Sequence, residues 1–142
     1  MNLDNIFLFL SYSPGPFWLL IILFPNSRRA MLLVDAFLIL LTMIFTTLTL
    51  PHIKDLLPII ATPTLGSIRV FLGSPEGTVG TWNHMILSDL WIGRWVALDL
   101  LKAHKSVWLR VLFIIPILFF GPLGLFFYLA YRIASQKKMS LT

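Results

Sequence analysis

Long apolar runs separated by short polar breaks follow one another along this chain, and they predict an all-α membrane protein. A membrane-crossing helix needs about 20 mostly apolar residues, because its backbone polar groups must be satisfied within the segment. Four runs approach this length, at residues 6–24, 30–50, 82–101 and 111–131. We therefore predict a polytopic membrane helix bundle of about four transmembrane helices in a single membrane domain, residues 1–134, followed by a disordered tail, residues 135–142.

Proline and glycine mark the breaks between these runs. The motif Ser13–Pro16 interrupts the first run, so we expect a short interfacial piece before its helix. Residues 52–80 contain three further prolines and scattered charges, which makes them too broken to span a bilayer. Here we expect one short interfacial helix, N-capped by Thr62 and stopped in the left-handed conformation by Gly73, and then a linker over residues 73–80.

The last run contains further breaks of its own. Pro116 lies inside it, and the glycines of Gly121–Gly124 permit close approach of another backbone or of a flat ligand. Small-residue helix packing is the plainer interpretation of this motif. At the end of the run, Tyr128, Tyr131 and Arg132 predict an anchor at the membrane interface.

Composition narrows the class of protein. With 58% hydrophobic and only 12% charged residues, the chain is too apolar for an ordinary soluble domain. It has no cysteine, which excludes disulfides and thiolate metal sites, and its three histidines are too few for the histidine-rich di-iron centre of membrane desaturases. The net charge of +5 comes from basic residues beside the apolar runs, which indicates contact with membrane lipid and no nucleic acid.

Ionisable and aromatic side chains gather in the third run, at Thr81–Asp99. A charged group at bilayer depth costs at least about 2.5–3.5 kcal/mol, so such groups mark functional or pairing sites. Asp89 and Arg94 lie on opposite sides of a stripe that occupies roughly 80° of the predicted helix. The residues of the stripe recur at spacings of four, three, four and four: His84, Ser88, Trp91, Trp95 and Asp99.

The second run carries a polar seam. Asp35 shares one helical face, within about 60°, with three threonines, Thr42, Thr46 and Thr49. In one interpretation the threonines bond to carbonyls of their own helix and Asp35 meets Arg28 or Arg29. In the other, the seam belongs to a functional site.

Three interpretations of the polar centre stay open on the residues alone. In the first, it performs acid-base catalysis on a lipid-soluble substrate. In the second, it binds pigment or lipid without catalysis, and in the third, its charges pair to hold helices together. His84 either bonds a backbone carbonyl or ligates the magnesium of a chlorophyll. Trp91 and Trp95 suit packing as well as a polyene, and Asp89 with Arg94 suits a buried charge arrangement.

The spacing W-x-H-M-x-x-x-D-L-x-x-G-R-W at Trp82–Trp95, followed by G-P-L-G at Gly121–Gly124, resembles the neoxanthin synthase family of small membrane proteins. The resemblance extends over roughly Trp18–Arg132. It implies an integral protein of a photosynthetic membrane, either the thylakoid or the plasma membrane of a photosynthetic bacterium. The implied ligand is a carotenoid or related isoprenoid, with chlorophyll or photosynthetic membrane proteins as further partners.

The same resemblance implies the isomerisation of an epoxycarotenoid, in which an epoxide opens and an allene forms without net oxidation. An acid and a base suffice, so no redox cofactor and no metal is expected. By the motif, Asp89, His84 and Arg94 are the catalytic candidates, with Asp89 the favoured acid because a membrane-buried carboxyl tends to be neutral near pH 7. The expected substrate-binding residues are the rest of the stripe, namely Trp91, Trp95, Ser88 and Asp99. The alternative is a non-catalytic pigment-binding or scaffold subunit.

Overall fold

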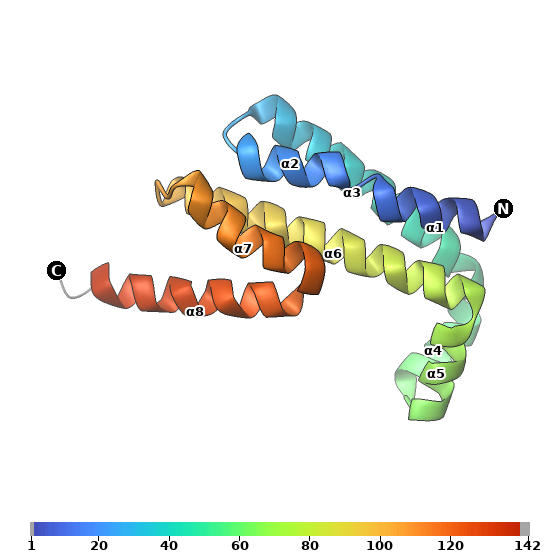
Figure 1. The fold of residues 1–142 in the computed structure, drawn as a ribbon. Helices are drawn as coiled ribbons and strands as arrows, with labels where there is room; N and C mark the ends of the chain where they lie inside the picture. The colour runs from blue at the N-terminus through green and yellow to red at the C-terminus, as the bar shows by residue number, and fades with distance from the viewer. Residues whose placement is uncertain (1, 140–142) are drawn as a thin grey trace. The chain divides into compact units, whose positions relative to one another are not determined.

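The computed structural model describes residues 2–139, with side chains to residue 135, and these residues form helices with no strand among them (Figure 1). The predicted all-α class is confirmed. The chain divides into two compact units. Unit 1 comprises Met1–Pro14 and Ala36–Leu87, and unit 2 comprises Gly15–Asp35 and Ser88–Thr142. Two long helices, α3 (Arg28–Thr49) and α6 (Pro75–Lys102), contribute residues to both units.

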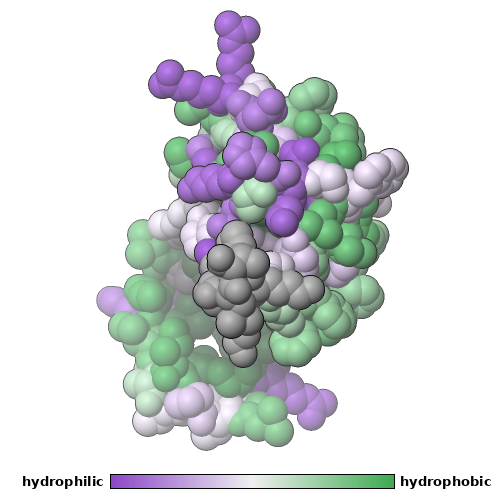
Figure 2. Space-filling view, turned by 90° about the vertical axis from the view of Figure 1, so that its left-hand side faces the viewer, coloured by the Kyte–Doolittle hydropathy of each residue, from purple (hydrophilic) through white to green (hydrophobic). Residues whose placement is uncertain are grey.

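Within the described residues, two helical stretches are long and apolar enough to cross a membrane, Leu3–Leu23 and Arg28–Ala61. Large apolar side chains stay exposed over the described residues, and Figure 2 shows such hydrophobic surface next to gathered hydrophilic groups. Both observations favour membrane association. The third and fourth predicted spans do not pass the same test, because α6 is too polar and the last run is divided, so a four-span bundle is not confirmed.

In unit 1, side-chain hydrogen bonds tie three helices together. The helix α1 (Leu3–Tyr12) stops just before the Ser13–Pro16 motif, as predicted. Its Ser11 Oγ accepts a hydrogen bond from Trp82 Nε1 of α6 at 3.1 Å. The fully buried Asn83, also on α6, donates from Nδ2 to the carbonyl oxygen of Leu41 on α3 at 3.0 Å. These bonds hold α1 and α3 against the first half of α6.

The segment between α3 and α6 is more helical than predicted. After α3, a 3-10 turn η1 (Leu50–His52) leads into α4 (Ile53–Ala61), and α5 (Leu65–Gly73) follows. Region 52–80 therefore holds two short helices rather than one.

The predicted cap of the short helix was wrong by two residues. Thr64, with extended backbone at φ −121° and ψ 151°, caps α5 by accepting from the amide of Ser67, whose hydroxyl completes a capping box. Thr62 follows the last residue of α4 and donates its hydroxyl to the carbonyl of Pro58. Thr64 is the better N-cap because its capping box satisfies two backbone donors, which Thr62 cannot do from the end of α4.

The α5 helix ends at Gly73 as predicted, but not through a left-handed glycine. Among the described glycines, a positive φ occurs at Gly121. At the end of α5, Ser74 instead donates its hydroxyl to the carbonyl of Phe71 and accepts from the amide of Gly77. Pro75 then begins α6, a position that suits proline, so the linker predicted over 73–80 is wrong.

In unit 2, α2 (Gly15–Leu23) packs on α7 (Val107–Phe120), which follows the α6–α7 turn. Trp18 of α2 lies directly on Gly93 of α6, where an added Cβ would collide with the indole ring. The glycine of the Gly-Arg-Trp motif therefore permits this close approach of α2 to α6.

The predicted last span is two helices. The α7 helix ends at Phe120, Gly121 turns the chain with φ +34°, and Pro122 begins α8 (Pro122–Met139). An added Cβ at Gly124 would collide with the backbone of α7 at Ile117, so α7 and α8 lie side by side (Figure 1). Pro116 sits inside α7 without ending it. The single span over 111–131 was wrong because a glycine in the left-handed region reverses the chain.

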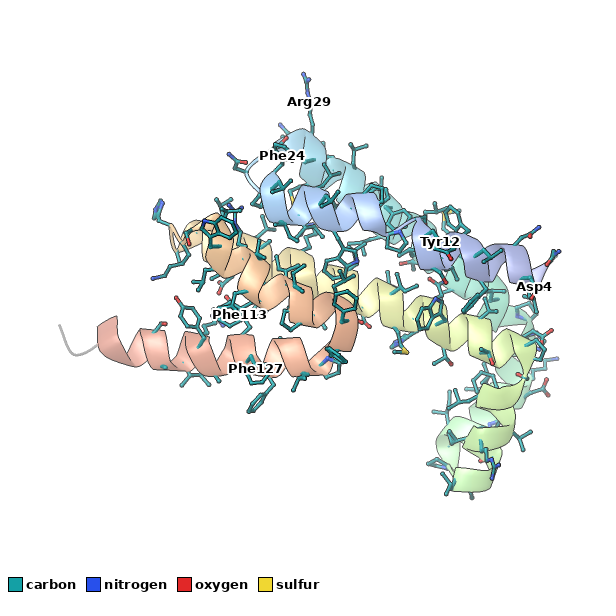
Figure 3. The ribbon with its side chains drawn as sticks, in the orientation of Figure 1. Asp4, Tyr12, Phe24, Arg29, Phe113 and Phe127 are labelled. Carbon is teal, nitrogen blue, oxygen red and sulfur yellow. The ribbon has the colours of Figure 1, made fainter. Side chains whose placement is uncertain are left out.

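Aromatic rings fill the space between α7 and α8. Phe113 lies on the side of α7 that faces α8, whereas Phe127 points away from α7 (Figure 3). Tyr128 is only 1% exposed and packs edge-on to Phe113 with ring centroids 5.4 Å apart, so it is not the interfacial anchor predicted for it. The predicted tail, residues 135–142, falls largely outside the described side chains, and residues 140–142 fall outside the described chain.

Candidate functional site

An apolar cavity of about 300 Å³ lies in unit 1. Its ionisable side chains are His52 of η1 and Glu76 and His84 of α6. The rest of the lining is mostly aliphatic and aromatic: Phe45, Leu48, Thr49, Leu56, Ile59, Ile60, Ile68, Phe71, Leu72, Gly80 and Thr81. The site therefore combines hydrocarbon walls with a small number of groups that exchange protons.

The sequence positions these groups by local rules. Glu76, Gly80 and His84 are four residues apart, so they share one face of α6, with about 12 Å of helix axis between the first and the last. Gly80 has open space where a Cβ would lie, which keeps the cavity free between the two ionisable groups. His52 reaches the cavity because α3 gives way to the η1 turn at Leu50.

His84 is held against an aromatic wall. Its ring centroid lies 5.8 Å from that of Phe45, at an interplanar angle of 52°. Of the catalytic residues predicted from the motif, His84 is the one that lines this cavity. His52 and Glu76 were missed, since both were assigned to an interfacial segment or linker. The signal for Glu76 was its eight-residue spacing from His84, which becomes visible once α6 is known to begin at Pro75.

The polar seam of α3 divides between the two interpretations. Thr42 and Thr46 donate to the carbonyls of Leu38 and Thr42, four residues earlier in their own helix, as the plainer interpretation predicted. Thr49 lines the cavity with His84. One end of the seam thus belongs to the candidate site.

Arg94 is bound to a carboxylate of α3 within unit 2. Its Nε lies 2.7 Å from Asp35 Oδ1, and its Nη2 donates to Asp35 Oδ2 at 2.8 Å. A charge-assisted hydrogen bond and a second close contact between opposite charges therefore join the two side chains. Asp35 therefore contacts α6, and the interpretation in which it meets Arg28 or Arg29 was wrong.

Asp89 is a residue of α6 whose side chain lies beside the turn between α7 and α8. Its carboxylate rests against Gly121, so that a Cβ added to this glycine would collide with it. The catalytic role that the motif implies for Asp89 stays a prediction.

Asp99 belongs to a polar and aromatic cluster in unit 2. It accepts a hydrogen bond from the hydroxyl of Tyr128, and its Oδ2 lies 3.0 Å from Nε of Arg132. Trp95 meets Tyr128 edge-on with centroids 5.5 Å apart, and the guanidinium of Arg132 lies 5.5 Å from the Trp95 ring centroid. The cluster fixes the second half of α6 to α8.

A second, smaller hollow of about 140 Å³ lies on unit 2. Four of the predicted site residues line it, namely Trp91, Arg94, Trp95 and Asp99, together with Leu98 and Lys102. Trp91 is 59% exposed there. The predicted site residues thus divide between the unit 1 cavity, which holds His84, and unit 2, which also contains Ser88 and Asp89. Their proposed roles stay predictions.

Comparison with protein-family models finds a match over most of the chain. The model of the ABA4-like family, described as ABA DEFICIENT 4-like, matches residues 5–128, which is most of the chain. Comparisons with curated proteins and with solved structures find no match.

Proposed function

This chain belongs to the ABA4-like family, which is linked to neoxanthin synthesis in the carotenoid pathway, and we propose that it isomerises the end group of an epoxycarotenoid or related isoprenoid. The observation that carries the proposal is the apolar cavity of unit 1, with His52, Glu76 and His84 in its lining. We place the protein in the thylakoid or plasma membrane of a photosynthetic bacterium, where such substrates dissolve.

The cavity supports a substrate of this kind by size and by chemistry. At about 300 Å³ it lies at the small end of the range of roughly 300–1,000 Å³ for small-molecule sites. It suits one ring-shaped end group, while the long polyene chain stays outside it. Aliphatic and aromatic walls bind hydrocarbon without leaving polar groups unsatisfied.

The proposed reaction needs only proton transfer. One carbon–oxygen bond of the epoxide breaks, the oxygen takes up a proton from an acid, and a carbon of the adjoining chain gives a proton to a base. No electrons leave the substrate, so its mass is unchanged. His84 is one of the two groups, and either His52 or Glu76 is the other.

The motif also implies that Asp89 is an acid and that Arg94 orients the substrate. The ion pair of Arg94 with Asp35 supports a positioning role, in which Arg94 keeps α6 in place. For Asp89, the competing roles of proton donor and support for the α7–α8 turn are separated by the substitution described in the Discussion.

The experiment is conversion by the full-length protein in mild detergent. It is incubated with an epoxide-bearing carotenoid and, separately, with the same carotenoid without the epoxide. We expect a product of unchanged mass from the first and no product from the second, as measured by liquid chromatography with mass spectrometry. Retention of the pigment without conversion would overturn isomerisation in favour of non-catalytic pigment binding, and absence of both would overturn both functions.

Substitutions in the cavity assign the roles. His84→Gln keeps a hydrogen-bonding side chain but removes the titrating ring, so turnover should fall by about a hundredfold while the pigment is retained. His52→Gln and Glu76→Gln identify the second group by the same criterion. Asp55→Asn, at an exposed carboxylate of α4 outside the cavity lining, is the control and should turn over normally. Wild-type turnover in His84→Gln would remove the cavity from the mechanism.

A further inference from the structure

A basic cavity of about 540 Å³ lies in unit 2, where α6 ends and α8 passes. The end of α6 and the following turn contribute Lys102, His104 and Lys105, and α8 contributes Arg132 and the aromatic ring of Tyr131. Nothing in the proposed isomerisation uses this cavity. Its chemistry therefore indicates a separate ligand.

The cavity keeps an excess of positive charge. Among the described residues that line it, Asp99 is the one carboxylate, and it is bound by Arg132 and by the hydroxyl of Tyr128. Lys102 and Lys105 form no ion pair with any carboxylate in the described part of the chain. Two cations directed at one cavity favour an anionic ligand.

The backbone fixes the basic turn in place. His104 has φ 53°, its amide donates to the carbonyl of Leu101 at 2.9 Å, and the amide of Lys105 donates to the carbonyl of Leu100 at 2.9 Å. These two bonds form a Schellman motif, whose left-handed position is ordinarily a glycine. A histidine there carries a conformational cost and contributes an imidazole to the lining of the cavity.

An apolar stripe begins three residues after Lys105. Trp108, in the first turn of α7, is 78% exposed, and exposed apolar side chains follow it at helical spacing, namely Leu112, Ile115 and Phe119. Residues four, three and four apart lie on one side of a helix. A tryptophan next to lysines, continued by an apolar stripe, is the arrangement found where a protein meets the membrane interface.

From these observations we propose that the cavity binds the phosphate of an anionic phospholipid at the membrane interface. Lys102 and Lys105 bind the phosphate, and Trp108 lies at the level of the glycerol. The stripe favours a lipid over free phosphate, because it indicates that α7 enters the membrane directly after the basic turn, which brings the cavity close to lipid headgroups.

The test measures binding to the full-length protein in an uncharged detergent by titration calorimetry. The probes are dihexanoyl phosphatidylglycerol, dihexanoyl phosphatidylcholine and inorganic phosphate. We expect phosphatidylglycerol to bind tightest, and more weakly as salt rises. The double variant Lys102→Gln/Lys105→Gln should weaken this binding on the order of tenfold to thirtyfold.

A matched control removes the same charge elsewhere. Lys54→Gln/Arg69→Gln takes two exposed cations from α4 and α5 of unit 1 and should leave phosphatidylglycerol binding unchanged. Trp108→Ala should weaken binding of the lipid but not of inorganic phosphate. Melting temperatures of all variants are measured alongside, so that a misfolded variant is recognised and replaced by the single substitutions.

Three outcomes would overturn the proposal. Equal loss of binding in both double variants would show a response to net charge rather than a site. Equal binding of phosphatidylglycerol and phosphatidylcholine would show that the site does not recognise the negative charge of the headgroup. Binding of inorganic phosphate as tight as that of the lipid, and insensitive to Trp108→Ala, would reject the lipid and assign the cavity to a soluble phosphate.

Discussion

Asp35 and Arg94 stand 59 positions apart in the sequence, and their side chains form a hydrogen-bonded ion pair within unit 2. The side chain of Asp35 is 42% exposed and that of Arg94 is 25% exposed. The pair's contribution to stability should therefore lie between that of a weak surface salt bridge and that of a fully buried one. Removing one partner of a fully buried pair destabilises a protein strongly. The Asp35–Arg94 pair links the first turns of α3 to the second half of α6.

Removing one partner of this pair should destabilise the protein by about 1–2 kcal/mol. Asp35→Asn and Arg94→Gln are each expected to lower the melting temperature in detergent. The double variant should be less destabilised than the sum of the two, because no uncompensated charge is left. Strictly additive effects would show that the two side chains are not coupled, and the measurement is a double-mutant cycle on thermal unfolding.

Gly121→Ala should be among the most harmful glycine substitutions. Its φ of +34° is unfavourable for a residue with a Cβ, and that Cβ would collide with the Asp89 carboxylate. We expect a loss of about 2 kcal/mol or more, measured by thermal unfolding. Gly73→Ala is the control, because an added Cβ there meets open space, and it should be neutral or slightly stabilising. Similar effects of the two would contradict the turn geometry.

Asp89→Asn separates the two roles proposed for Asp89. Because its carboxylate lies against the α7–α8 turn, we expect the substitution to lower stability by about 1 kcal/mol, with turnover per folded molecule retained. A fall in turnover of about a hundredfold with unchanged melting temperature would identify Asp89 as the proton donor instead. Both quantities are measured on the same preparation.

Thr64→Ala should destabilise α5 by about 1 kcal/mol, since it removes the hydroxyl that accepts from the Ser67 amide, although the backbone bond to the Ser67 hydroxyl remains. Thr62→Ala removes only a hydroxyl that donates to a carbonyl of α4, and it should have a smaller effect. Hydrogen exchange of the α5 amides, followed by mass spectrometry, reports the difference. A larger effect from Thr62→Ala would restore Thr62 as the cap.

Some helix boundaries of this protein could be predicted from local sequence chemistry. Prolines and glycines at Ser13–Pro16 end α1 because proline removes a helix hydrogen bond. The same reasoning failed at the start of α6, where Pro75 was taken as part of a linker although proline is favoured in the first turn of a helix. Proline alone therefore indicates a boundary but not on which side of it the helix lies.

The candidate site was only partly accessible for a related reason. His84 was found because a motif and a helical stripe both include it. His52 and Glu76 join it through η1 and the extra turns of α6, so their proximity depends on how three segments pack. No spacing within one segment encodes that arrangement.

The sequence by itself determined the all-α class, the apolar stretches and the family, because helix periodicity, hydropathy and motif spacing are properties of neighbouring residues. The tertiary structure decided the partner of Asp35, the reversal of the chain at Gly121 and the lining of the cavity around His84. Each of these depends on side chains from separate helices meeting in space. Several carboxylates and cations of suitable charge were available along the chain, and only the packing of the helices selected which of them meet.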